Sequence, residues 1–313
     1  MAERRSSTAE RSRVHPAPAV SVDDSAKPPP ADIAAGDNDP PDAAAGRPTR
    51  RRTVLRRRNG KSAPASDLVA VEEPLEIRVN GEAIAVTMRT PAPGEDAELA
   101  LGFLHGEGIA AHFDVARVRE CRAPEGDGGL AEVTLRGELD PAGGWQRRFY
   151  ATSSCGICGK SSIDAVRAAA EPLPDGPRVR AEVLDRMPAL LREGQRGFER
   201  TGGLHAAGIF SPSGELAVLR EDVGRHNAVD KAVGRALIRE LVPLNRQILL
   251  VSGRVSFEII QKALLAGVAI VAAVSAPSSL AIELAEEANM TLVGFLRPGG
   301  FNVYTGSERV EFS

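Results

Sequence analysis

The chain has 313 residues, a formal net charge of -3 and a hydrophobic fraction of 42%, which is the ordinary balance of a globular protein with a large core. Aromatic residues make up only 4%, too few for stacking along single-stranded nucleic acid. The longest apolar run, 268–274, is too short to span a bilayer. We therefore expect no nucleic-acid partner and no membrane partner.

The three cysteines are Cys121, Cys155 and Cys158. A small, odd number argues against a secreted disulfide scaffold, and no apolar stretch follows the charged N-terminus as it would in a signal peptide. We therefore expect a cytoplasmic protein, in which a C-x-x-C pair indicates redox, sulfur or metal chemistry. Cys121, without a partner in the sequence, is expected to be a buried hydrophobe.

Residues 1–66 are predicted to form a disordered tail, because Ala, Pro, Asp, Ser and Arg dominate and no apolar period is present. The basic end of this tail carries Arg50, Arg51, Arg52, Arg56, Arg57 and Arg58. Such a cluster fits contact with phosphates or with an acidic partner. Because no motif specifies either contact, we favour a solvated tail.

Residues 67–152 are predicted to form a small β-rich α+β domain. Apolar and polar residues alternate on both sides of Asn80-Gly81, which predicts a β-hairpin over 75–88. The other elements expected here are a helix that begins after Gly94 and strands at 130–135 and 148–151.

Residues 153–313 are predicted to form a larger α/β domain that binds a cofactor. The expected helices are at 161–170, 181–192, 227–241, 257–265 and 280–288, and the expected strands at 204–210, 215–220, 247–251, 268–274 and 291–296. Alternation of helices with nearly continuous apolar strands predicts three layers, with helices on both faces of a mostly parallel sheet.

The first chemical motif is Cys155-Gly-Ile-Cys158, between a predicted strand and a predicted helix. The positive end of that helix and the neighbouring Lys160 favour the thiolate, which is the nucleophilic form of cysteine. The second thiol can resolve or protect a sulfur adduct on the first.

The same pair has two other interpretations. It supplies half of a structural zinc site, but no second C-x-x-C or H-x-x-x-H pair is present to complete four ligands. Because the other two zinc ligands are missing, we predict no permanently bound metal. A thioredoxin-like redox pair would belong to a smaller β-α-β unit.

Polar clusters follow each late strand of the predicted sheet. The candidate ligand-binding residues in them are Arg225, His226, Asn227 and Lys231; Ser252, Gly253 and Arg254; and Phe295, Leu296, Arg297, Pro298, Gly299 and Gly300. Because ligands bind at the carboxyl ends of parallel strands, the clusters predict one edge that holds a large anion such as a nucleotide. The plainer alternatives are a helix cap at Asn227 or Asp222 and a core histidine at His205.

Five strings together resemble the FdhD family of formate dehydrogenase accessory sulfurtransferases over about residues 68–310. They are C-G-I-C-G, G-G-L-H-A-A, E-D-V-G-R-H-N-A-V-D-K, S-G-R-V-S-F-E and G-F-L-R-P-G-G-F-N-V-Y, in the order of the family. The resemblance implies a cytidine-deaminase-like α/β fold and a homodimer. It does not imply deaminase activity, because Ala207 stands where such enzymes carry a catalytic acid two residues after the histidine.

The resemblance also implies a function. A cysteine desulfurase would donate persulfide sulfur to Cys155, with Cys158 as its partner thiol. The sulfur would pass to the molybdenum of a bis(molybdopterin guanine dinucleotide) cofactor, bound as a substrate through its guanine nucleotide by segment 295–300, and formate dehydrogenase would use the product. A zinc-binding or cofactor-binding chaperone, a nucleotide deaminase and a thiol–disulfide oxidoreductase are the alternatives.

Overall fold

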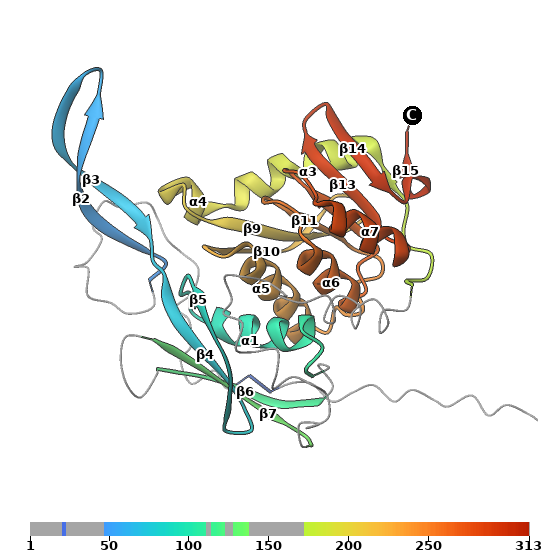
Figure 1. The fold of residues 1–313 in the computed structure, drawn as a ribbon, viewed down its shortest axis with the longest axis horizontal. Helices are drawn as coiled ribbons and strands as arrows, with labels where there is room; N and C mark the ends of the chain where they lie inside the picture. Colours follow the sequence, from blue (N-terminus) through green and yellow to red (C-terminus); the bar gives the residue numbers. More distant parts are fainter. Residues whose placement is uncertain (1–20, 23–46, 111–113, 123–127, 138–171, 313) are drawn as a thin grey trace, which may run out of the picture.

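The computed structural model describes residues 21–22, 47–110, 114–122, 128–137 and 172–312. Cys155, Cys158, the expected strand at 148–151 and the expected helix at 161–170 lie outside these ranges. In Figure 1 the described chain forms a small sheet, a larger sheet with helices on its faces, and a hairpin that projects from the body. Within the described ranges, no helix is both long and apolar enough to cross a membrane.

The small sheet has the strand order β1-β6-β7-β4-β5. Its strands are β1 (Ser21–Val22), β4 (Glu73–Val79), β5 (Glu82–Arg89), β6 (Val115–Arg122) and β7 (Gly129–Leu135). The predicted hairpin is confirmed as β4 and β5, and the turn between them has positive φ at both Asn80 and Gly81, which suits the twist of a hairpin. Strand β7 is confirmed, whereas β6 is an additional strand.

The larger sheet has the order β10-β9-β11-β12-β13-β14. Its strands are β9 (His205–Phe210), β10 (Leu216–Asp222), β11 (Ile248–Val251), β12 (Ile270–Ala273), β13 (Thr291–Arg297) and β14 (Gly300–Thr305). Only β11–β12 and β12–β13 pair in parallel. The prediction of a mostly parallel sheet is wrong, because the β9–β10 and β13–β14 hairpins add antiparallel strands at the two edges and β9 runs antiparallel to β11.

The remaining elements are α1 (Glu95–Gly106), α3 (Ala181–Gly194), α4 (Arg196–Thr201), α5 (Arg225–Ile238), α6 (Phe257–Leu265), α7 (Ser279–Glu287), the 3-10 turn η4 (Ser307–Arg309) and the short pair β8 (Val179–Arg180) and β15 (Val310–Glu311). The helices expected over 181–192, 227–241, 257–265 and 280–288 and the helix after Gly94 are confirmed. Helix α4 is additional.

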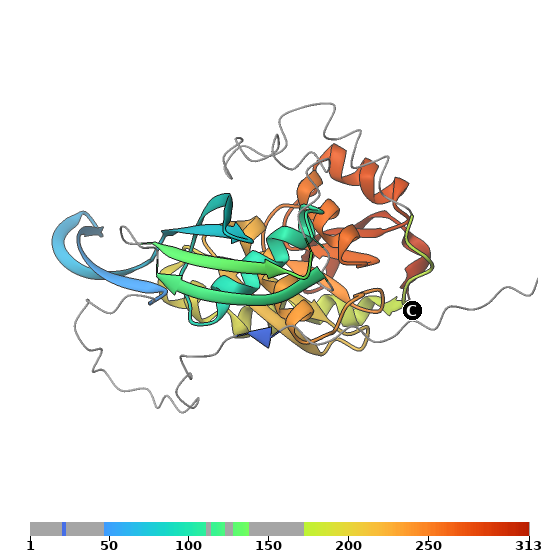
Figure 2. The same ribbon diagram turned by 90° about the horizontal axis from the view of Figure 1, so that it is seen from below.

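Side chains of the larger sheet alternate between two cores, as the period of a strand requires. Leu250 and Ala272 face the α3 side, whereas Leu249 and Val271 face the side of α5 and α6. The second core continues through α1 into the small sheet, so the two sheets share one hydrophobic interior. In Figure 1, α1 lies between the small sheet and α5, and in Figure 2, seen from below, the small sheet lies in front of the helices.

Two glycines let α1 and α5 touch backbone to backbone. A Cβ placed on Gly102 of α1 would lie 1.8 Å from the carbonyl oxygen of Asp230, and a Cβ on Gly234 of α5 would lie 1.8 Å from that of Glu98. No side chain fits in either space. The small sheet is therefore held against the larger one by a contact that only glycine allows.

Part of the predicted disordered tail is a hairpin. Strands β2 (Thr49–Arg58) and β3 (Lys61–Ala70) pair antiparallel across a turn at Asn59 and Gly60. The prediction of disorder up to residue 66 is therefore wrong from residue 49 onward. The turn residues gave a signal, but arginines on both faces hid the apolar alternation of a half-buried strand. Cys121, expected to be buried, is exposed on β6.

Candidate functional site

One edge of the larger sheet gathers the predicted polar clusters. The carboxyl ends of β11, β12 and β13 lie side by side because these strands are parallel. Strand β9 is antiparallel to both β10 and β11, so its first residue, His205, lies beside Asp222 at the end of β10 and near the end of β11. The sequence-based expectation of a single polar edge therefore agrees with the topology.

His205, Gly253 and Arg225 meet at this edge. A Cβ placed on Gly253 would lie 3.3 Å from His205 Nδ1, a tight contact, and 3.7 Å from the Cβ of Arg225, an ordinary one, so the glycine leaves room for the His205 ring. The preceding Ser252 is held by two bonds to β9: its N–H donates to the Ala206 carbonyl at 2.9 Å, and its hydroxyl accepts from the Ala206 N–H at 2.8 Å. These hydrogen bonds hold the start of β9 and the end of β11 in fixed positions at the polar edge.

The edge carries positive charge. Partial burial lowers the pKa of His205, and the nearby guanidinium groups of Arg225 and Arg254 lower it further, although Asp222 acts in the opposite direction. The Nε of Arg225 is buried and has no hydrogen-bond partner among the described residues. Two guanidinium groups beside a neutral imidazole favour an anion that accepts several hydrogen bonds, such as a phosphate.

A second pair connects α5 to α6. His226 Nε2 lies 2.8 Å from a carboxylate oxygen of Glu258 and 3.1 Å from the hydroxyl of Ser256. These two contacts fix the imidazole ring from the first turn of the neighbouring helix. The sequence analysis did not assign Glu258 or Ser256 to the site, although a Ser-x-Glu string at a helix start was the available signal.

Asn227 and Lys231, predicted to bind the ligand, point into the interior. The amide of Asn227 donates to the Met88 carbonyl at 2.7 Å. The ammonium of Lys231 is fully buried and lies within 3.0 Å of the Thr90 carbonyl and of the Glu95 and Asp222 carboxylates. We therefore assign both residues a structural role, because their polar groups are already used to join the end of β5 to α5.

Segment 295–300 is the turn of a hairpin, not an open loop after the last strand. The base of this turn reaches the edge, where the Phe295 N–H donates to the Ser275 carbonyl at 3.1 Å. Leu296 is buried in the core on the α3 side and so cannot face a ligand. Arg297, Gly299 and Gly300 are exposed at the tip.

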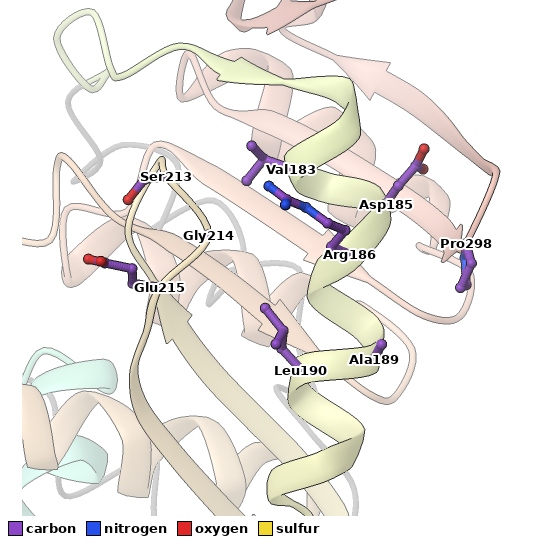
Figure 3. A pocket seen from close by; sticks show the side chains of 9 residues that line it. All are labelled: Val183, Asp185, Arg186, Ala189, Leu190, Ser213, Gly214, Glu215 and Pro298. Carbon is purple, nitrogen blue, oxygen red and sulfur yellow. The ribbon is translucent and has the colours of Figure 1, made fainter.

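Pro298, at the same tip, lines a cavity of about 460 Å³ beside α3. Figure 3 shows Asp185 and Ala189 on the helix between Pro298 and the turn at Ser213 and Gly214. The lining of the cavity includes neither Arg225 nor Arg254. Among the described residues, the positive edge and this cavity are therefore separate features.

The fold is mixed α/β, and its strand ends bring two arginines and a histidine together. Such an arrangement can bind a phosphate-bearing ligand. The sequence model of the FdhD/NarQ family matches residues 70–311, and the chain belongs to that family.

Known proteins of the family resemble the chain over most of its length. It is 53% identical to the sulfur carrier protein FdhD of Streptomyces coelicolor, over 81% of this chain and 92% of that protein. It is 45% identical to the sulfur carrier protein FdhD of Saccharolobus solfataricus, over 78% of this chain and 91% of that protein. The crystal structure of a formate dehydrogenase accessory protein from Desulfotalea psychrophila superposes with a TM-score of 0.67 at 24% identity, over 84% of this chain and 99% of that chain. This superposition supports the mixed α/β fold, and the expected likeness to cytidine deaminases stays a prediction.

Proposed function

We propose that the chain is a cytoplasmic sulfurtransferase that carries sulfur for the maturation of formate dehydrogenase. The observation that carries the proposal is a C-x-x-C motif in a chain whose sheet edge presents Arg225, Arg254 and His205 to an anion. Relatives named as sulfur carriers support the same role. One chain would thus combine a thiol for sulfur with a site for a phosphate-bearing acceptor.

Loading is a thiol exchange. The Cys155 thiolate attacks the outer sulfur of the persulfide on a cysteine desulfurase, a bond to that sulfur forms, and the desulfurase thiolate leaves. Cys155 then carries the sulfur as a persulfide. No external oxidant or reductant takes part, because one sulfur–sulfur bond replaces another.

Delivery needs two electrons, because the carried sulfur leaves as sulfide. Attack of the Cys158 thiolate on the Cys155 sulfur supplies them: a Cys155–Cys158 disulfide forms and sulfide is released toward the molybdenum of the bound substrate. This substrate is the bis(molybdopterin guanine dinucleotide) cofactor, whose phosphates meet Arg225 and Arg254. Segment 295–300 would contact its guanine nucleotide. The chain orients and shields the cofactor, and the metal performs the subsequent chemistry.

Intact-mass spectrometry tests the proposal after incubation with a cysteine desulfurase and cysteine. The wild type should gain the mass of one sulfur, removable by dithiothreitol, and Cys155→Ala should gain none. Cys158→Ala should still be loaded but should release less sulfide, because no second thiol forms the disulfide. Cys121→Ala is the matched control, since Cys121 is an exposed thiol on β6, and it should behave as the wild type.

The alternatives predict other results. If the wild type gained no sulfur while a known acceptor was loaded in the same mixture, the carrier function would be wrong. Stoichiometric zinc that depends on both Cys155 and Cys158 would favour the chaperone. Reduction of insulin by the protein would favour the oxidoreductase.

A further inference from the structure

The hairpin formed by β2 and β3, residues 49–70, is here called the basic hairpin. In Figure 1 it extends away from both sheets. It contains six arginines and one lysine against a single acid, Asp67, in a chain whose net charge is -3. Its charge is therefore opposite in sign to that of the rest of the chain.

The cations are placed where they repel one another. Arg50, Arg52, Arg56 and Arg58 are all separated by even numbers of residues, so they share one face of β2, and Lys61 lies directly opposite Arg58. Like charges in neighbouring positions of a hairpin destabilise it, and an isolated two-stranded sheet is marginal in water. Within the hairpin, Arg56 of this face forms an ion pair with Asp67 at 3.2 Å, which offsets part of the repulsion. An anionic partner would remove the repulsion.

Several features favour a protein as that partner over a nucleic acid. Leu55 is 75% exposed and Val69 is 38% exposed, so apolar side chains stand between the arginines, where a phosphate backbone offers nothing to contact. The hairpin has no aromatic residue on which a base could stack. The outer edge of β2 contains no proline and can accept a strand from another chain.

The root of the basic hairpin lies next to the candidate site. Strand β3 packs on α4, and a Cβ placed on Gly203 would lie 3.6 Å from the Cβ of Ala70. Gly203 is two residues before His205, the first residue of β9. A protein held by the hairpin would therefore be held close to the positive edge.

We propose that the basic hairpin is a docking arm for an acidic surface on the protein that donates sulfur. This inference rests on the proposed function. The sulfur-accepting cofactor is a free anion, not a protein, and the edge can bind it without a docking arm. The donor carries its persulfide on a protein and must be brought close, and opposite charges give fast, salt-sensitive encounters that dissociate after each transfer.

Loading kinetics with a cysteine desulfurase test the proposal. The arm variant is R50E/R52E/R56E/R58E, and the control is R119E/R178E/R180E/R246E, which changes the net charge equally at four exposed arginines of the body. The arm variant should lower kcat/KM for persulfide formation at least about tenfold through a higher KM, and the control should change it little. Salt should slow the wild type and leave the arm variant nearly unaffected.

A milder variant, R50Q/R52Q/R56Q/R58Q, should lower kcat/KM in the same direction but by less. Unchanged circular dichroism and Tm of the variants would show that the body stays folded. Equal kcat/KM in the arm and control variants would overturn the docking arm while leaving sulfur carriage intact. If even the wild type formed no persulfide, the proposed function itself would fail.

Two further measurements identify other occupants. Loss of binding to a 20-base-pair DNA duplex in the arm variant, with loading unchanged, would assign the hairpin to nucleic acid. A change in sedimentation of the arm variant, with loading unchanged, would assign it to a second copy of this chain. Either result would overturn the proposal.

Discussion

The ammonium nitrogen of Lys231 lies 2.8 Å from a carboxylate oxygen of Asp222, and neither side chain is exposed. Burial alone would lower the pKa of Lys231, but the carboxylates of Glu95 and Asp222 outweigh it and raise the pKa, so the lysine stays charged. Asp222 also accepts from the Thr90 N–H at 3.0 Å. These charged contacts thus join the end of β5 to β10 and α5.

Lys231→Met should therefore destabilise the protein strongly. The change leaves the Asp222 charge buried without its cation, which costs about 3–5 kcal/mol in comparable pairs. Chemical unfolding followed by circular dichroism measures the loss, and Lys61→Met, at an exposed position of the basic hairpin, is the control. The double variant D222N/K231M should recover part of the stability; no loss in Lys231→Met would show that the pair is not needed.

The close approach of α1 and α5 gives a prediction with an unusual sign. In an open helix, replacing glycine with alanine stabilises by about 0.8–1.0 kcal/mol. Gly234→Ala should instead destabilise by about 1–3 kcal/mol, because its Cβ would overlap the Glu98 carbonyl and force the helices apart. Gly137→Ala, where a Cβ meets nothing within 4 Å, should leave Tm unchanged. Equal Tm values for the two variants would contradict the backbone contact.

Arg225 and Arg254 should each contribute to nucleotide binding. Removal of one charge-assisted hydrogen bond costs about 1.5–3 kcal/mol, so Arg225→Ala and Arg254→Ala should weaken binding of guanosine diphosphate about tenfold to a hundredfold. Isothermal titration calorimetry measures the Kd. Arg119→Ala, on the small sheet, is the control. If Arg297→Ala weakened binding and the two edge variants did not, the nucleotide would bind at the β13–β14 turn and not at the edge.

The sequence predicted the elements with a clear period and failed where both faces of an element carry the same kind of residue. The β4–β5 hairpin and helix α6 could be predicted because one face of each is apolar and their turns or ends are marked. Strand β2 could not, because arginines occupy both of its faces. The antiparallel pairing of the edge strands of the large sheet, β10 and β14, could not be predicted from periodicity either. The periodicity of a strand does not show which strand it pairs with.

The sequence predicted where the candidate site lies, but not which of its side chains point to the ligand and which point into the interior. Arg225 and Lys231 belong to one sequence motif, yet the first lies at the positive edge and the second in the interior. Their different roles follow from the direction of each side chain on α5, which depends on the packing of α5 against α1 and the sheet. Glu258 was missed because its partner, His226, is 32 positions earlier in the chain.

The lowered pKa of His205 makes anion binding dependent on pH. Burial and the neighbouring Arg225 and Arg254 bring the pKa below its usual value of 6.5, so His205 is neutral in the free protein near pH 7.5. A phosphate beside it would favour the imidazolium and raise its pKa, so binding takes up a proton. Affinity for guanosine diphosphate should therefore rise as pH falls from 8 toward about 6, below which the phosphate itself protonates.

The same shift has the opposite effect on stability. The folded-state pKa is depressed, so the unfolded chain binds more protons below pH 6.5, and the stability contribution of neutral His205 is lost as pH falls through the folded pKa. His205→Gln should flatten both profiles, because glutamine keeps polar atoms but does not titrate. Calorimetric titrations and unfolding at pH 5.5, 6.5 and 7.5 measure them. An affinity profile that His205→Gln left unchanged would place the anion away from His205, and with it the phosphates of the cofactor.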